Sequence, residues 1–374
     1  MKFSKAALLA GVPALFLAAC SEPAPGGVAD RGQGQATSTE MLPTPAVHPQ
    51  PLEVPPVTPS ASPVARGIDE ATWSAQAATP QAKRDALIRA QVLLARAHFS
   101  PGVIDGQDGG NMRNAVSSYE AANGLPVDGQ MDDQVWAKLV EDDGPAMTDY
   151  TITAEDVEGP FRPVPAKYEE MAKLDHLGYA TAAEGLAEKF HMDEALLKAL
   201  NPGADFAVAG TKIVVAAPGA EKLPTAVTLI EVDKGKNQVR AYGEGETLLA
   251  VYPATVGSSD LPTPSGEWAV RTIAPEPTYT YDPSRLNFGD KSVGKLTIKA
   301  GPNNPVGAVW IDLTKDTYGI HGTPDPRLVG KTASHGCVRL TNWDARQLSQ
   351  AVSKQTKVVF VGSEKTPAKT KTKT

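Results

Sequence analysis

The sequence predicts a multidomain α+β protein in which small helical modules precede a mostly β C-terminal domain. Three observations support this class. The 374 residues exceed the usual size of one domain, apolar residues recur at helical spacing within residues 80–143, and short β-branched runs separated by Pro and Gly fill residues 225–362. The net charge of −7 and the absence of a large basic field speak against nucleic acid as a partner.

The N-terminus resembles an export signal. A basic start precedes the uncharged apolar run Ala6–Ala19, which is too short to cross a bilayer but typical of a signal peptide. The run ends in Leu-Ala-Ala-Cys, which resembles the lipobox of bacterial lipoproteins. The resemblance implies removal of residues 1–19, lipid attachment to Cys20 and an anchored protein of the periplasm. Because Ser21 rather than Asp follows the cysteine, we expect the outer membrane. A plain secretory signal is the alternative.

Residues 20–79 predict a disordered, proline-rich linker. Ser21–Arg66 contains ten prolines, six charged residues and no Phe, Trp or Tyr, so it has little apolar surface to offset the entropy cost of ordering. When extended, such a chain reaches on the order of 100 Å, which would let an anchored protein act at a distance from its membrane. The basic tail, residues 363–374, is also predicted to be disordered.

Residues 80–143 predict a domain of three helices. Two segments carry apolar positions at helical spacing, and Gly124 fits a C-cap after the second. The residues of the two predicted faces are Leu87, Ala90, Gln91, Leu94, Ala97, Ala115, Val116, Tyr119 and Ala122. An Asp-Gly-Gln turn occurs at Asp105 and again at Asp128. This arrangement resembles the peptidoglycan-binding domain of cell-wall enzymes, and the resemblance implies peptidoglycan as a partner. A generic helical bundle is the alternative.

Residues 175–218 predict a small mixed module. Helices over residues 182–190 and 193–200 are followed by Asn201-Pro202-Gly203, which ends the second helix, and by the β-branched strand TKIVV. The order helix, helix, LNPG, strand resembles a LysM module, and the resemblance implies binding to the glycan of peptidoglycan. The usual Gly-Asp-Thr-Leu start is replaced here by Ala183–Leu186, which weakens the case for sugar binding.

Residues 225–362 predict a sandwich-like or barrel-like β domain. Three strands are separated by turns at Asp233–Asn237 and Gly243–Glu246. GEWAVRTI, GKLTIKA and GAVWIDL follow as further strands, and a helix at Asn342–Val352 and the strand TKVVFV close the domain. Many short strands with loops between them favour this class over a parallel α/β sheet.

Cys337, one of two cysteines in the chain, lies in the strand CVRL. Because side chains alternate along a strand, Cys337 and Arg339 share one face, while Val338 and Leu340 anchor the other. A nucleophilic thiol needs a base or a cation nearby. Arg339 is a candidate to hold an anionic group of a substrate, or to pair with a local acid.

The candidate bases are His321 and His335. His335 is two residues from the cysteine, where we expect it to flank the turn that contains Ser334 and Gly336. His321, in the strand-like segment TYGIHG, has the separation needed to return on a neighbouring strand, so it is the preferred base. Gly336 lets the backbone approach a substrate closely, and the amides of Gly336 and Cys337 are candidates for an oxyanion hole.

Two other roles for Cys337 compete with catalysis. A zinc site could recruit His321, His335 and Cys337, but no second cysteine and no regular ligand spacing supports it. A buried structural cysteine would be inert, which fits poorly with the flanking His-Gly and Arg. We therefore do not expect a metal site at Cys337.

The C-terminal domain resembles the L,D-transpeptidase family of the YkuD type. The resemblance rests on the His-Gly pair at His321, on SHGCVRL at Ser334–Leu340, and on AGPNNPVGAVWIDL and TPSG upstream. It implies that Cys337 attacks the L,D peptide bond before the terminal D-Ala of a peptidoglycan stem tetrapeptide, with His321 as the base. Ser334 and His335 would shape the turn that holds the oxyanion, and no cofactor is implied.

The reaction implied by this resemblance is an acyl transfer through a thioacyl-enzyme. An amine on a neighbouring stem then forms a 3→3 cross-link. Attachment of a lipoprotein, exchange of D-amino acids and hydrolysis are other outcomes that the motif leaves open. A non-catalytic tether between membrane and wall is a rival of another class, and the complete Cys, His and Gly set argues against it.

Overall fold

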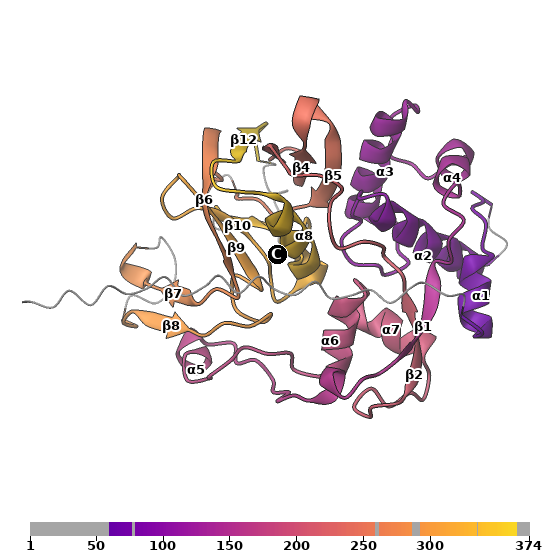
Figure 1. Cartoon of the computed structure of the whole chain (residues 1–374), viewed down its shortest axis with the longest axis horizontal. Helices are drawn as coiled ribbons and strands as arrows, with labels where there is room; N and C mark the ends of the chain where they lie inside the picture. Colours follow the sequence, from indigo (N-terminus) through magenta and orange to yellow (C-terminus); the bar gives the residue numbers. More distant parts are fainter. Residues whose placement is uncertain (1–59, 77–78, 259–261, 286–291, 335, 365–374) are drawn as a thin grey trace, which may run out of the picture. The chain divides into compact units, whose positions relative to one another are not determined.

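The computed structural model describes residues 60–76, 79–258, 262–285, 292–334 and 336–364 (Figure 1). The chain divides into two units, Met1–Val47 and His48–Thr374, and all described residues belong to the second. The predicted lipobox with Cys20, most of the linker and most of the tail lie outside the described residues. Within the second unit, three hydrophobic cores mark a helical domain, a βααβ unit and a β domain.

The first described helix lies inside the predicted linker. α1 (Pro63–Asp69) starts with Pro in its first turn, and its Ala65 and Ile68 are fully buried in the core of the βααβ unit. Asp69 accepts hydrogen bonds from the amides of Ala146 and Met147 at 2.7 and 3.0 Å. The prediction of disorder up to residue 79 is wrong for this segment, because two apolar side chains on one helical face are enough to dock a short helix.

The helical domain contains two copies of one hydrogen-bond pattern. α2 (Pro80–Arg96) and α3 (Gly110–Asn123) are each followed by an Asp-Gly-Gln turn, and α4 (Asp133–Leu139) closes the domain. Gln91 on α2 accepts from two amides of the first turn, and Glu120 on α3 accepts from two amides of the second. The three predicted helices are confirmed, with Ala122 exposed rather than on the buried face.

A βααβ unit follows the helical domain. β1 (Met147–Thr151) pairs antiparallel with β2 (Lys212–Ala216), and α6 (Ala182–Lys189) and α7 (Glu194–Leu200) lie between them in the chain. The two helices and the second strand lie where the sequence predicts them. The predicted module starts at residue 175 and misses β1, because a long connection separates that strand from α6.

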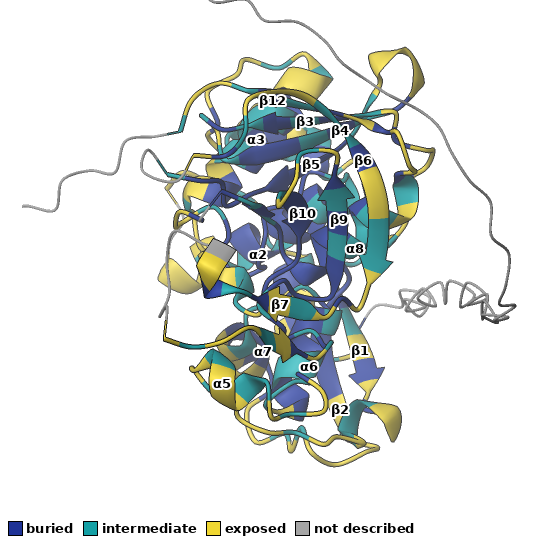
Figure 2. Cartoon of the chain, turned by 90° about the vertical axis from the view of Figure 1, so that its left-hand side faces the viewer, coloured by how far each residue is buried: buried dark blue, intermediate teal, exposed yellow. Residues whose placement is uncertain are grey.

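The β domain is built on one eight-stranded sheet of order β11-β10-β9-β6-β12-β3-β4-β5. All of β10 is buried, whereas β9 alternates between buried and intermediate residues (Figure 2). The mostly β character is confirmed, but the strands form one mixed sheet rather than a sandwich. The reason is the ten-residue β6, which pairs with β12 along its first half and with β9 along its second. The bounds are β3 Leu229–Asp233, β4 Gln238–Tyr242, β5 Leu248–Pro253, β6 Gly266–Pro275, β9 Val309–Leu313, β10 Gly319–His321, β11 Val338–Arg339 and β12 Lys357–Val361.

A two-stranded ribbon stands apart from this sheet. β7 (Tyr279–Tyr281) pairs antiparallel with β8 (Leu296–Ile298). The short helix α5 (Tyr168–Met171) contacts β8, although it belongs to the connection between β1 and α6 (Figures 1 and 2). A segment of the βααβ unit therefore reaches the β domain.

Helix α8 (Asn342–Ala351) packs on the sheet a few residues after Cys337. Thr341 caps it by accepting from the amide of Asp344 at 3.2 Å, and Ala345 and Leu348 are fully buried in the core of the β domain. Asp344 in its first turn is also buried and accepts the hydroxyl of Ser100 at 3.0 Å. Burial raises the pKa of Asp344 to about 7, although the hydrogen bonds with Thr341 and Ser100 lower it.

We expect Asp344→Asn to change how stability depends on pH. Because the folded state raises this pKa from 3.8, the stability that it contributes is present below about pH 4 and is lost as pH rises through about 7. Relative to the variant, the wild type should therefore lose on the order of 3 kcal/mol of unfolding free energy from about pH 4 to about pH 8. Urea unfolding of both proteins across this range measures the effect, and parallel curves would contradict it.

Candidate active site

The predicted base lies on β10, and the predicted nucleophile, Cys337, directly precedes the parallel neighbour β11. In the pair β10 and β11, Ile320 is opposite Val338 and His321 is opposite Arg339. Ile320 and Val338 are buried in the core, so alternation places His321, Arg339 and the preceding Cys337 on the other face. The imidazole, the guanidinium and the thiol are thus presented on one face, with Cys337 diagonal to His321.

His321 is held by the backbone and by an indole. Its Nδ1 lies 2.6 Å from the carbonyl oxygen of Gly322; because a carbonyl only accepts, Nδ1 carries the proton of the neutral ring and Nε2 can accept one. The ring stacks on Trp310 with centroids 5.3 Å apart. Burial lowers the pKa of His321 to about 3, and the charge of Arg339 lowers it further. The imidazole is therefore neutral near pH 7, although a pKa this low makes the resting ring a weak base.

Gly319 makes room for this indole. Trp310 on β9 is opposite His321 in register, and a Cβ on Gly319 would lie 2.5 Å from Trp310 Cζ2. Trp310 Nε1 also donates to Asp312 at 3.3 Å, which orients the ring. Position 319 must therefore lack a side chain for the indole to lie against the imidazole.

The thiol of Cys337 is half-buried. Its Sγ donates to the carbonyl oxygen of Thr317 at 3.7 Å. Burial raises the pKa of the thiol, and the Gly319 amide and the Arg339 charge oppose the rise. The resting pair is thus a thiol and a neutral imidazole. The thiol bonds to Thr317 rather than to His321, and catalytic hydrogen bonds commonly align only once a substrate is bound.

The turn before Cys337 differs from the prediction at Gly336. The Gly336 amide donates to Ser334 Oγ at 3.0 Å, and this hydroxyl donates to the carbonyl of Cys337 at 2.6 Å. Gly336 has a φ of 117°, and a Cβ there would meet Tyr318 at 2.9 Å. Its amide is engaged within the turn and does not match the expected oxyanion role, which leaves the Cys337 amide as the candidate donor. His335 lies outside the described residues.

Arg339 is the cation of the site. Its charge is one of the influences that lower the pKa of Cys337 and of His321. It also opposes the rise in the pKa of Tyr168 and of Tyr279. A guanidinium in this place favours the thiolate and can hold a carboxylate of a substrate.

Three tyrosines beside the site were not predicted. Tyr279 and Tyr281 are on β7, and the ring of Tyr168 on α5 lies 5.9 Å from the first and 4.6 Å from the second, between centroids. The charge of Cys337 raises the pKa of the Tyr279 phenol, and the charge of Arg339 lowers it. No shared motif joins residue 168 to the β7 tyrosines, so no sequence signal could have brought them together.

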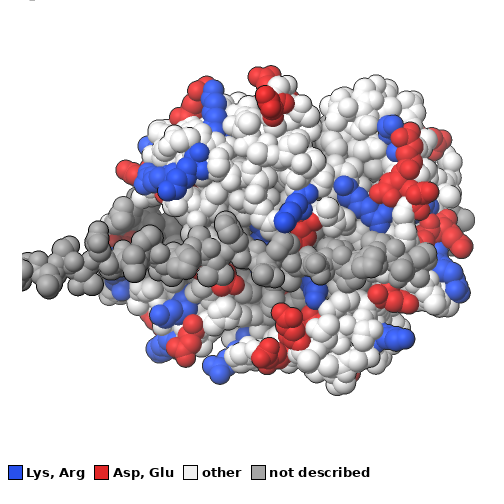
Figure 3. All heavy atoms as spheres, viewed as in Figure 1, with Lys and Arg blue, Asp and Glu red and all other residues white. Residues whose placement is uncertain are grey.

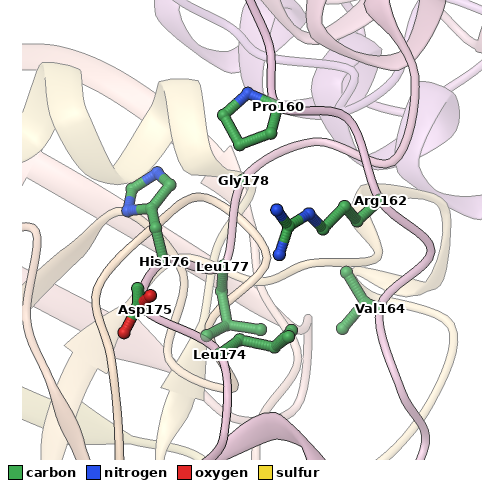
Figure 4. Close-up of a pocket in the computed structure, with 8 residues that line it drawn as sticks. All are labelled: Pro160, Arg162, Val164, Leu174, Asp175, His176, Leu177 and Gly178. Carbon is green, nitrogen blue, oxygen red and sulfur yellow. The ribbon is translucent and has the colours of Figure 1, made fainter.

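Two cavities lie away from the thiol. One, of about 120 Å³, lies in the connection between β1 and α6 and is bordered by Pro160, Arg162 and His176 (Figure 4). The other, of about 430 Å³, borders the connection between α7 and β2 near Asn201. Neither is lined by a residue of β10 or β11.

Charge on the surface is mixed. Acidic and basic side chains are interspersed on the face drawn in Figure 3. In the part of the chain that the structure describes, no group of three His, Cys, Asp or Glu side chains could hold a metal ion. The helices of this part include none that is both long and apolar enough to cross a membrane.

Two family profiles match the sequence. Residues 227–360 match YkuD, the L,D-transpeptidase catalytic domain, and residues 83–139 match a peptidoglycan binding domain. The β domain and the helical domain thus each coincide with one family.

Two curated relatives agree with the first profile, and a solved structure is similar to a larger part of the chain. The YkuD protein of Bacillus licheniformis, named as an L,D-transpeptidase, is 30% identical over 177 residues, which are 47% of this chain and 90% of that protein. YqjB of Bacillus subtilis, named likewise, is 34% identical over 34% of this chain and 68% of its own length. A solved L,D-transpeptidase from Xylanimonas cellulosilytica is 16% identical, covers 74% of this chain and 92% of that chain, and has a TM-score of 0.32. With its catalytic-domain match and a 30% identical relative covered over 90% of its length, the chain belongs to the L,D-transpeptidase family.

Proposed function

We propose that the protein is a cysteine-dependent L,D-transpeptidase that acts on the stem tetrapeptides of peptidoglycan. The observation that carries this proposal is the register of β10 and β11, in which Arg339 is opposite His321. By alternation, Cys337, directly before β11, then lies diagonal to the histidine on the same face. A nucleophile, a neutral base and a cation on one face are the groups that acyl transfer to a thiol requires.

The first half-reaction releases D-Ala. As the donor binds, the thiol leaves the Thr317 carbonyl, and His321 Nε2 takes its proton. The sulfur then attacks the carbonyl carbon of the L,D peptide bond, and the Cys337 amide donates to the oxyanion. The C–N bond breaks, His321 returns the proton to the departing amine, and a thioester on Cys337 remains.

The second half-reaction transfers the acyl group to an amine. The side-chain amine of a diamino acid on a neighbouring stem attacks the thioester carbon, and His321 accepts its proton. The C–S bond breaks, the thiol is protonated again, and a 3→3 cross-link results. Neither half-reaction calls for an oxidant or a metal ion, since every proton moves between His321 and the reacting groups.

The upstream modules fit an enzyme directed to the cell wall. We propose that Cys20 carries lipid and anchors the protein to the outer membrane, and that the linker lets the catalytic domain reach peptidoglycan. The helical domain matches a peptidoglycan binding domain. The βααβ unit is proposed to act as a LysM-like glycan-binding module, and the cavity of about 430 Å³ near Asn201 is a place where a sugar could bind.

Purified protein incubated with stem tetrapeptides, and analysed by mass, tests the proposal. A cross-linked dimer together with free D-Ala is the expected result. Shortened stems without dimer would instead indicate a hydrolase that uses water as the acceptor. An unchanged substrate would indicate a non-catalytic tether, and would contradict the proposal.

A further inference from the structure

The connection between β1 and α6 crosses to the β domain. Residues 158–178 of this connection, here called the strap, contain α5 and the cavity of Figure 4. The strap belongs in sequence to the βααβ unit, but its helix α5 contacts β8 and its Leu177 bonds to the backbone of the β domain. Since the strap is residues 158–178, it lies outside the matched catalytic segment, residues 227–360.

The C-terminal end of the strap is fastened to the β domain. The Leu177 amide donates to the carbonyl of Ala300 at 2.8 Å, and the Asn303 amide donates back to the carbonyl of Leu177 at 3.0 Å. Asn303 Nδ2 also donates to the carbonyl of Gly178 at 3.1 Å. Leu177 is buried, so this end of the strap is packed structure and not a free loop.

Gly301 shows how closely the two backbones approach. Its backbone has a φ of 139°, which residues with a side chain rarely adopt. A Cβ at this position would also overlap the carbonyl oxygen of Leu177. The β domain therefore accepts the strap at a position where only glycine fits.

The strap then brings an aromatic ring to the active site. Tyr168 at the start of α5 contacts Tyr279 and Tyr281 with tilted rings, and tilted aromatic pairs at this spacing are attractive. Tyr279 and Tyr281 are two residues apart on β7, so they share one face of the ribbon. Together the three rings form a wall, called here the tyrosine wall.

The tyrosine wall lies within the electrostatic range of the catalytic groups. The charge of Arg339 lowers the pKa of the Tyr168 and Tyr279 phenols, and the charge of Cys337 raises that of Tyr279. Burial raises the pKa of both phenols, so they stay neutral at physiological pH. An apolar wall beside one cation and one thiol suits a short peptide with both carboxylates and aliphatic segments.

We propose that Tyr168 determines specificity for the acyl donor, and that the strap supplies it to the catalytic domain from outside. This inference rests on the proposed function, since the donor is taken to be a stem tetrapeptide. The aliphatic part of the donor packs on the tyrosine wall, and one of its carboxylates pairs with Arg339. Because Tyr168 contacts tyrosines rather than the thiol, its loss weakens donor binding and leaves the chemical step unchanged.

The test separates donor binding from the reactivity of the thiol. In the full chain, acylation of Cys337 is followed at increasing concentrations of the tetrapeptide, and alkylation of Cys337 is followed with iodoacetamide. For Tyr168→Ala, the half-saturating donor concentration is expected to rise about tenfold, while the maximal acylation rate and the alkylation rate stay within about twofold. Glu169→Ala, an exposed neighbour on α5, is the matched control and should equal the wild type.

Two further variants refine the result. Tyr168→Phe keeps the ring and should stay within about twofold of the wild type in half-saturation. Tyr168→Leu keeps apolar bulk without a flat ring, should give a smaller rise than alanine, and serves if the alanine variant does not fold.

Several outcomes would overturn the inference. One is a half-saturating donor concentration that is unchanged in the alanine and leucine variants. Another is a lowered half-saturating concentration, which would mean that the strap obstructs the donor. The third is an equal loss of the acylation and alkylation rates, which would mean that Tyr168 acts through the fold. In each case the wild type still reacts and the proposed function stands. A wild type that is alkylated but never acylated by the tetrapeptide would instead refute the proposed function, and this inference with it.

Discussion

Replacing Cys337 by alanine is expected to lower the release of D-Ala from stem tetrapeptides by about four orders of magnitude or more. The variant keeps β11 and His321 but lacks the atom that forms the acyl bond. Cys337 is half-buried and has a weak thiol contact with Thr317, so the free energy of unfolding should change by less than about 1 kcal/mol. Quantifying D-Ala by mass spectrometry, together with a denaturant titration, separates the two effects.

The control for this variant is Thr332→Ala. Thr332 is exposed, five residues before the cysteine, and its hydroxyl donates to the carbonyl of Leu328 at 3.3 Å. It should release D-Ala at close to the wild-type rate. If Cys337→Ala released D-Ala as fast as this control, the thiol would not be the nucleophile.

Replacing Glu188 by alanine is expected to destabilise the protein by about 3–5 kcal/mol. Glu188 on α6 is buried against α8, where both of its oxygens accept from Asn342 Nδ2 at 3.0 Å and one accepts from Tyr179 Oη at 3.2 Å. Burial raises the pKa of this carboxyl to about 7, and the charge of Arg346 opposes the rise. Alanine would leave a cavity and would remove the acceptor of the Tyr179 hydroxyl. Asn342 Nδ2 would keep only its bond to the Pro302 carbonyl. Urea unfolding measures the loss.

Glu170→Ala is the matched control for this loss. Glu170 forms an exposed ion pair with Lys173 at 2.8 Å, and exposed pairs contribute less than about 1 kcal/mol. A Glu188 variant as stable as this control would show that the βααβ unit and the β domain do not depend on the buried network.

The elements that carry the chemistry were predictable because their patterns are local. In CVRL, alternation alone places Cys337 and Arg339 on one face, and the structure has Val338 buried in the core on the other. The separation between His321 and Cys337 is enough for a loop between two parallel neighbours, as β10 and β11 turn out to be. The helices of residues 80–143 were predictable for the same reason, since their apolar spacing spans several turns.

Features that depend on distant contacts were not predictable. α1 is seven residues long and is held by the packing of Ala65 and Ile68 on another unit. β1 pairs with β2 across more than sixty residues of sequence, and nothing in its five residues specifies that partner. Gly336 was expected to offer its amide to a substrate, but a hydrogen bond to Ser334 occupies it. The approach of Tyr168 to β7 likewise depends on the strap and on Gly301.

The most direct test of the proposed mechanism is the mass of the intact protein after incubation with a tetrapeptide whose diamino-acid side-chain amine is acetylated, so that no acceptor amine is present. The wild type is expected to gain the mass of the donor less D-Ala. The adduct should map to the peptide containing Cys337, and hydroxylamine should remove it, as expected for a thioester. Release of D-Ala without such an adduct, or an adduct on another residue, would contradict the account.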